Sequence, residues 1–173
     1  YVTQYYHSKY DRPSTKDDKG RIRYAKSFDS RSPLRNVAVI VHGAHSWYEG
    51  LGETFTYDCD VLLSPCVVES AGCGTTMLLA EKKYRSVISR LYRNGAVTFV
   101  GNSVPSPAPH QELRYSFWNS VLAGNTTGIA HRHALNCKMI TVLETDQLER
   151  GGTERRTMIM RHLYGDPAFN PAL

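Results

Sequence analysis

No run of apolar residues in this 173-residue chain approaches the roughly 20 positions that a membrane-spanning helix needs. The apolar segments that do occur, 37–41 and 61–68, have the length of strands. We therefore expect no membrane span. The chain also lacks an initiator methionine and a secretory leader, which is typical of a processed or excised piece of a larger precursor.

A dominant sign of charge is also missing. Lysine and arginine together number 21 against 16 aspartates and glutamates, a net charge of +5, and the basic residues are scattered among the acidic ones. Proteins that bind nucleic acid usually gather their basic residues on one face, so we expect no nucleic-acid partner. Hydrophobic residues make up 41% of the chain, which is enough for one folded domain with a real core.

Cysteine is scarce, with four residues: Cys59, Cys66, Cys73 and Cys137. No two of them form the Cys-x-x-Cys pair that is typical of zinc sites, so metal binding through cysteine is weakly supported. Whether Cys59, Cys66 and Cys137 pack in the core or form disulfides stays open.

Aliphatic residues are almost absent from positions 1–35, which are rich in Tyr, Lys, Arg, Asp and Ser. We interpret 1–35 as an extended arm or surface loop and 36–173 as the folded domain. Within that domain, strands are expected at 36–41, 60–68 and 96–100, and the second should bulge or split near Pro65, because proline cannot donate to a ladder. The first should be buried on both faces, because it has no polar alternation.

Helical patterns separate these strands. Helices are expected at 77–93 and 111–123, a further helical candidate follows at 128–139, and 153–164 is expected to pack on the core. Residues 139–143 fit either the end of a helix or a strand. This order predicts an α/β fold with a mostly parallel central sheet flanked by helices on both faces.

Each expected strand is followed by residues that could take part in catalysis or substrate binding. His42-Gly43 ends the first, Gly72-Cys73-Gly74 follows the second, and the proline-rich loop 103–110 follows the third. In parallel sheets, functional residues gather beyond the carboxyl ends of the strands. We therefore expect His42, Cys73 and this loop to lie along one edge.

An imidazole and a thiol together suit nucleophilic catalysis. His42 can take the proton of Cys73, whose thiolate attacks a carbonyl far better than the thiol does. A helix capped by Thr75 or Thr76 would favour that anion through its dipole. The backbone amides of Gly43 and Cys73 are the candidate oxyanion hole.

Four sequence blocks resemble the caspase–gingipain–legumain–separase clan of cysteine peptidases, and most closely its gingipain family. They are Val-Ile-Val-His-Gly with the downstream Trp47, Ser-Ala-Gly-Cys-Gly around Cys73, the Gly-Ala strand within 93–103, and the Gly-Asp-Pro turn within 163–168. The blocks occur in the order of the family and cover roughly 36–171.

This resemblance implies a caspase-like catalytic domain and a secreted thiol protease, a hydrolase that cleaves protein or peptide substrates through an acyl-enzyme. It implies action outside the cell or at its surface, and contact with other chains or fragments of a larger precursor. It implies no required cofactor and leaves room for a structural calcium ion. The candidate substrate-pocket residues are His45, Trp47, Ser103, Val104 and Pro105.

Other functions remain open. The gingipain family places an orienting carboxylate upstream of its histidine, whereas the candidates in this chain, Glu49, Glu53 and Glu69, all follow it. One alternative is therefore a catalytically inactive binding or assembly module with the same fold. Another is a metal site built from His42, His45 and a cysteine.

Overall fold

The computed structural model of the protein describes residues 15–16, 22–23, 38–43, 45–51, 55–56, 63–77, 86–105, 111–144 and 153–171. Within the expected arm, β1 (Thr15–Lys16) and β2 (Ile22–Arg23) form an antiparallel pair. The other positions of 1–35 lie outside the described residues, so the extended arm stays a prediction.

A four-stranded sheet organises the domain in the order β3-β6-β7-β8. Its strands are β3 (Val39–His42), β6 (Cys66–Ser70), β7 (Ala96–Asn102) and β8 (Arg161–Gly165). The first three run parallel, and β8 pairs antiparallel with β7. This confirms the expected mixed α/β character and the mostly parallel sheet. A second, small sheet pairs β4 (Gly50–Leu51) with β5 (Phe55–Thr56).

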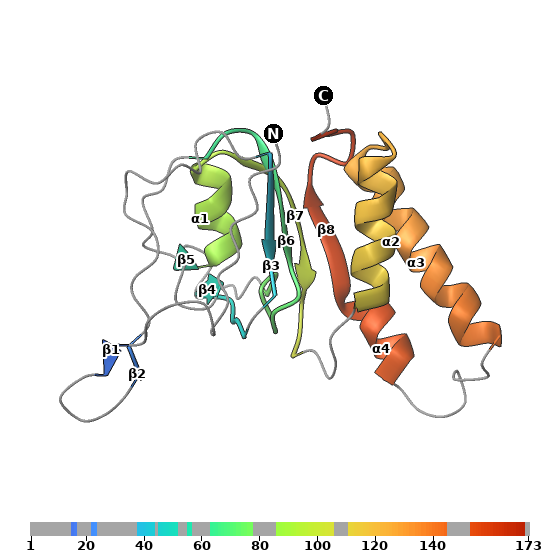
Figure 1. Ribbon diagram of the computed structural model, residues 1–173, viewed down its shortest axis with the longest axis horizontal. Coiled ribbons are helices and arrows are strands. Elements are labelled where there is room, and N and C mark those ends of the chain that lie inside the picture. The colour runs from blue at the N-terminus through green and yellow to red at the C-terminus, as the bar shows by residue number, and fades with distance from the viewer. Residues whose placement is uncertain are drawn as a thin grey trace.

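Helices cover both faces of the four-stranded sheet (Figure 1). On one face lies α1 (Val87–Arg93), and on the other lie α2 (Gln111–Leu122) and α3 (Thr127–Glu144). Because side chains alternate along a strand, β6 supplies both cores. Val68 packs in the core that contains α1, and Val67 packs in the core that contains α2 and α3.

The strand predictions hold in position and differ at their ends. β6 begins directly after Pro65, because proline has no N–H to give to a ladder. β7 continues past the expected end at Val100 to Asn102. The expectation that the first strand is buried on both faces is wrong, since only Ile40 of β3 is buried and Val41 is 52% exposed.

A single helix from Met77 to Arg93 is also wrong. Ser86 has extended backbone angles, φ −79° and ψ 136°, and caps the N-terminus of α1, which begins at Val87. Its Oγ accepts a hydrogen bond from the Ser89 N–H at 3.1 Å. Residues 78–85 lie outside the described part of the chain. Apolar spacing alone did not reveal this break, because serine fits both a helix surface and a cap.

The C-terminal third also differs from expectation. α2 matches its prediction closely, and α3 runs through 139–143, which settles those residues as helix. The segment 153–164 divides into α4 (Thr153–Met160) and the strand β8. The strand was missed because Arg161-His162-Leu163-Tyr164 has little aliphatic character and its extended conformation comes from pairing with β7.

The cap at Ser86 gives a test, because a helix that begins at Val87 and a continuous helix over 77–93 predict stability changes of opposite sign for the same substitution. Ser86→Ala should lower the free energy of unfolding by about 1 kcal/mol, because an N-cap acceptor is lost. If Ser86 lay in the interior of a continuous helix, Ser86→Ala would raise the free energy of unfolding by a few tenths of a kcal/mol, because alanine has the higher helix propensity. Urea unfolding of Ser86→Ala measures the difference, with Ser89→Ala as the control that keeps the cap acceptor.

Candidate active site

The carboxyl ends of the three parallel strands bring the predicted site residues to one edge. His42, the last residue of β3, is in register with Ser70, the last residue of β6. The Ala71 N–H donates to the His42 carbonyl at 3.0 Å, so the segment that carries Cys73 is tied to the end of β3. Cys73 follows Ser70 by three positions, a chain length that reaches about 11 Å at most. Cys73 and His42 therefore lie at the same edge of the sheet.

The imidazole of His42 is held by hydroxyl groups. Its Nδ1 lies 3.0 Å from the Ser70 Oγ and 3.2 Å from the Ser46 Oγ. The Gly72 N–H donates to the same Ser70 Oγ at 3.1 Å, so a fully buried hydroxyl links the ring to the turn before Cys73. Burial, together with a smaller contribution from the positive charge of Arg114, lowers the pKa of His42 to about 4. The ring is therefore neutral at pH 7.

The turn that carries Cys73 is fixed from both sides. Asn102, buried at the end of β7, donates through Nδ2 to the carbonyls of Ala71 at 3.2 Å and Gly72 at 3.1 Å. The Gly74 N–H donates to the Val104 carbonyl at 3.1 Å. The backbone of Cys73 is thus anchored to the strand and loop that follow in the sheet.

Trp47 packs against this turn, as a wall of the site would. A Cβ added at Gly74 would lie 3.1 Å from the Trp47 ring, and the φ of Gly74 is +54°, a conformation that favours glycine. Glycine is therefore required here by both backbone and space. Of the other pocket candidates, His45 and Pro105 are exposed, while Ser103 and Val104 are half-buried.

The loop after β7 is only partly described, since 106–110 lie outside the described residues. The Ser103 hydroxyl donates to the Met160 carbonyl at 3.2 Å, and His162 Nε2 lies 3.1 Å from the Ser103 Oγ. Because the Ser103 proton points to a carbonyl, this serine–histidine pair is a structural link between the loop and β8. It is not a second nucleophile.

The cysteines differ in surroundings. Cys66, Cys73 and Cys137 are not in disulfides, whereas Cys59 lies outside the described residues. Burial raises the pKa of the Cys66 thiol to about 12, so this thiol is inert. Cys73 is half-buried, and Cys137 lies 3.5 Å from the His133 Nε2 on the surface of α3. Cys137 is thus the internal comparison for any reactivity assigned to Cys73.

A buried ion-pair cluster lies directly beneath the edge, and sequence reasoning missed it. Glu69 of β6 is fully buried between two arginines. Arg161 of β8 donates to its Oε1, and Arg114 of α2 donates to its Oε2 at 2.9 Å. Arg161 also donates to the Ser70 carbonyl at 3.2 Å and lies 3.4 Å from the Asn102 Oδ1. Spacing could not signal this cluster, because its members come from three distant segments.

The cluster corrects one expectation about the orienting carboxylate. Glu69 is engaged by both arginines, and the partners of the His42 Nδ1 are the two serines. Glu69 therefore does not orient the imidazole. Glu53 lies outside the described residues, and Glu49 is half-buried on the turn before β4. Among the described residues, the side chains in hydrogen-bond contact with the imidazole are Ser70 and Ser46.

Two other expectations concern helix support and metal binding. Residues 73–76 form a turn, and Met77 is not helical, so no helix begins at Thr75 or Thr76 within the described stretch that ends at Met77. Among the described residues, no group of three or more His, Cys, Asp and Glu side chains is arranged to hold a metal ion. This finding does not support a metal site of His42, His45 and Cys73.

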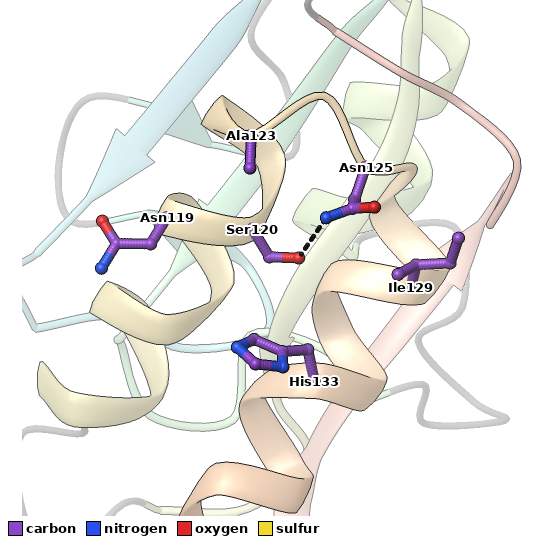
Figure 2. A pocket seen from close by; sticks show the side chains of 6 residues that line it. All are labelled: Asn119, Ser120, Ala123, Asn125, Ile129 and His133. Carbon is purple, nitrogen blue, oxygen red and sulfur yellow. Dashed lines mark hydrogen bonds between the residues drawn. The ribbon is translucent and has the colours of Figure 1, made fainter.

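The pocket in Figure 2 lies elsewhere, between the C-terminal half of α2 and the N-terminal half of α3. It has a volume of about 260 Å³ and is lined by Asn119, Ser120, Ala123, Asn125, Ile129 and His133. Asn125 Nδ2 donates to the Ser120 Oγ at 3.2 Å, as the dashed line shows. None of these residues belongs to the edge that carries His42.

Among the helices of the described residues, none could span a membrane.

The buried cluster predicts a large effect from a small change. Glu69→Gln removes the carboxylate charge and leaves two guanidinium groups without a counterion, so the free energy of unfolding should fall by about 3–5 kcal/mol. Glu112→Gln is the matched control, because Glu112 is 69% exposed and pairs with Lys138 at the surface. That change should cost less than about 1 kcal/mol. Similar losses in the two variants by urea unfolding would contradict the account of the cluster.

The two depressed histidine pKa values predict a pH dependence of stability. Burial lowers the pKa of His131, like that of His42, from 6.5 to about 4, with smaller contributions from Arg161 and His162. Between these values the unfolded chain binds more protons than the folded protein, so stability falls as pH drops from about 6.5 to 4. Each histidine adds at most about 1.4 kcal/mol per pH unit to the slope.

Chemical denaturation across this pH range measures the slope. His131→Asn should flatten it, whereas His45→Asn, at an exposed position, should leave it unchanged. An unchanged slope in His131→Asn would contradict the burial argument.

Comparisons of the chain with protein-family models, with curated proteins and with solved structures find no match.

Proposed function

We propose that the protein is a cysteine endopeptidase with a caspase-like, gingipain-like catalytic domain, in which Cys73 is the nucleophile and His42 is its proton acceptor. One observation carries the proposal. His42 ends β3 in register with Ser70 and lies within hydrogen-bond distance of the Ser70 hydroxyl. Three positions after Ser70 comes Cys73, a half-buried cysteine that is not in a disulfide. A thiol and a neutral imidazole at one sheet edge, each followed by glycine, suit acyl transfer.

The reaction runs in two halves. His42 takes the thiol proton of Cys73, and the sulfur attacks the peptide carbonyl carbon to form a tetrahedral oxyanion. The carbon–nitrogen bond breaks, the amine leaves with the proton from His42, and a thioester to Cys73 remains. A water molecule then gives a proton to His42 and attacks the thioester. The acid product leaves, and the proton returns to the sulfur of Cys73.

The charges at the edge bear on this chemistry in two ways. His42 is neutral at pH 7 and can accept a proton, but a pKa of about 4 makes it a weak base, because burial and the charge of Arg114 disfavour the imidazolium. The Gly72 and Gly74 amides already donate to Ser70 and Val104, so the oxyanion-hole proposal concerns the Gly43 and Cys73 amides. The guanidinium of Arg114, close to Gly43, adds positive charge near a developing oxyanion.

Ser70 is proposed as a positioning residue in place of a carboxylate. Its Oγ accepts from the Gly72 N–H and meets the His42 Nδ1, so it fixes the ring relative to the Cys73 turn. A hydroxyl stabilises an imidazolium less than a carboxylate does, which favours a slower enzyme. The same feature favours the alternative of an inactive binding or assembly module with this fold.

By the same resemblance, we propose that the protein acts outside the cell or at its surface on protein or peptide substrates. Other chains or fragments of a precursor are its proposed partners. The reaction of Cys73 and His42 needs no cofactor. A structural calcium ion is suggested only by the resemblance to the gingipain family.

The first test is loss of hydrolysis in Cys73→Ala. Cleavage of a fluorogenic peptide library should fall by roughly 10³-fold or more, because no other thiol stands at this edge among the described residues. Cys137→Ala is the matched control and should cleave at the rate of the unmodified protein. Absence of thiol-dependent cleavage in the unmodified protein, or equal loss in both variants, would favour the inactive module.

A further inference from the structure

We propose that Arg114 forms an anion-binding subsite beside His42, which takes a carboxylate of the peptide substrate. This inference rests on the proposed peptidase function and names a class of substrate for it. The carboxylate can come from an Asp or Glu side chain or from the C-terminus of a peptide, and these two sources share the same recognition chemistry.

The first support is the charge of the buried cluster. Glu69 contributes one negative charge, while Arg114 and Arg161 contribute two positive ones. Arg161 is almost fully buried and has further acceptors in the Ser70 carbonyl and Asn102. The uncompensated positive charge therefore lies on the Arg114 side, where the whole side chain is 20% exposed.

The second support is a set of unused donors. Arg114 uses Nε to reach Glu69, and among the described residues no acceptor lies within hydrogen-bond distance of its Nη1 or Nη2. These two nitrogens carry four N–H groups in a planar fork that matches a carboxylate. The Glu69 pair holds the fork in one orientation, so a carboxylate would meet a preorganised partner.

The third support is the position of these donors. A Cβ added at Gly43 would lie 3.5 Å from Nη1 and 3.9 Å from Nη2, so the fork faces the residue that follows His42. The charge of Arg114 also acts on the His42 ring. A substrate whose scissile bond lies at His42 and Cys73 would therefore pass within reach of the fork.

The geometry at Gly43 allows a test that leaves the buried ion pair intact. Gly43 is not among the glycines with positive φ, and no atom of the described residues lies closer to its Cβ position than 3.5 Å, so a Cβ fits there. Gly43→Asp places a carboxylate against the fork and occupies the subsite from within. Gly43→Asn is the control of equal shape without charge.

The experiment measures binding rather than turnover. The full chain with Cys73→Ala is titrated with fluorescent peptide pairs that differ only by Glu against Gln at one position, or by a free against an amidated C-terminus. One or both acidic members should bind about 10-fold more tightly than their neutral partners at low salt. The pair that shows the difference identifies the source of the carboxylate. Gly43→Asp should abolish the preference, and Gly43→Asn should retain it.

Equal binding of acidic and neutral peptides would overturn the subsite, as would equal loss of preference in the two Gly43 variants. An acidic preference in binding without cleavage by the unmodified protein would remove the peptidase proposal and leave the subsite. Cleavage by the unmodified protein, without any acidic preference in binding, would remove the subsite and leave the peptidase proposal.

Discussion

The buried carboxylate of Glu69 is the constraint on which the rest of this edge depends. A charge removed from water is tolerated only when it is paired and hydrogen-bonded, and here one glutamate has two arginines. Arg161 comes from β8 and Arg114 from α2, so the cluster joins the sheet to the helical layer on one face. Folding must bring all three segments together before the buried Glu69 carboxylate has both of its partners.

The site is built on top of this cluster. Arg161 also contacts the Ser70 carbonyl and the Asn102 side chain. The Asn102 side chain donates in turn to the carbonyls of Ala71 and Gly72, directly before Cys73. Ser70 in turn meets the His42 ring. The imidazole, the turn and the side chain of Arg114 are therefore positioned by one connected, largely buried polar network. A catalytic or binding role at this edge would use geometry that folding has already fixed.

The sequence was informative where local signals decide structure. The β-branched runs that became β3 and β6 predicted a parallel sheet, and the rule about carboxyl ends placed His42 and Cys73 on one edge. Local signals failed where distant partners decide. β8 has no strand pattern of its own, and Glu69 meets Arg161 across 92 positions of the chain. The role of Ser70 was hidden for the same reason, since a hydroxyl fits turns, caps and buried networks equally well.

The central claim is that Cys73 forms an acyl-enzyme with the help of His42. The most direct measurement is mass spectrometry of the full chain after reaction with a peptide thioester or an acyloxymethyl ketone, followed by peptide mapping of the adduct. The account predicts a single adduct on Cys73 that is lost in His42→Ala, with Cys66 and Cys137 unmodified. Adducts shared between Cys73 and Cys137, or unchanged labelling in His42→Ala, would contradict it.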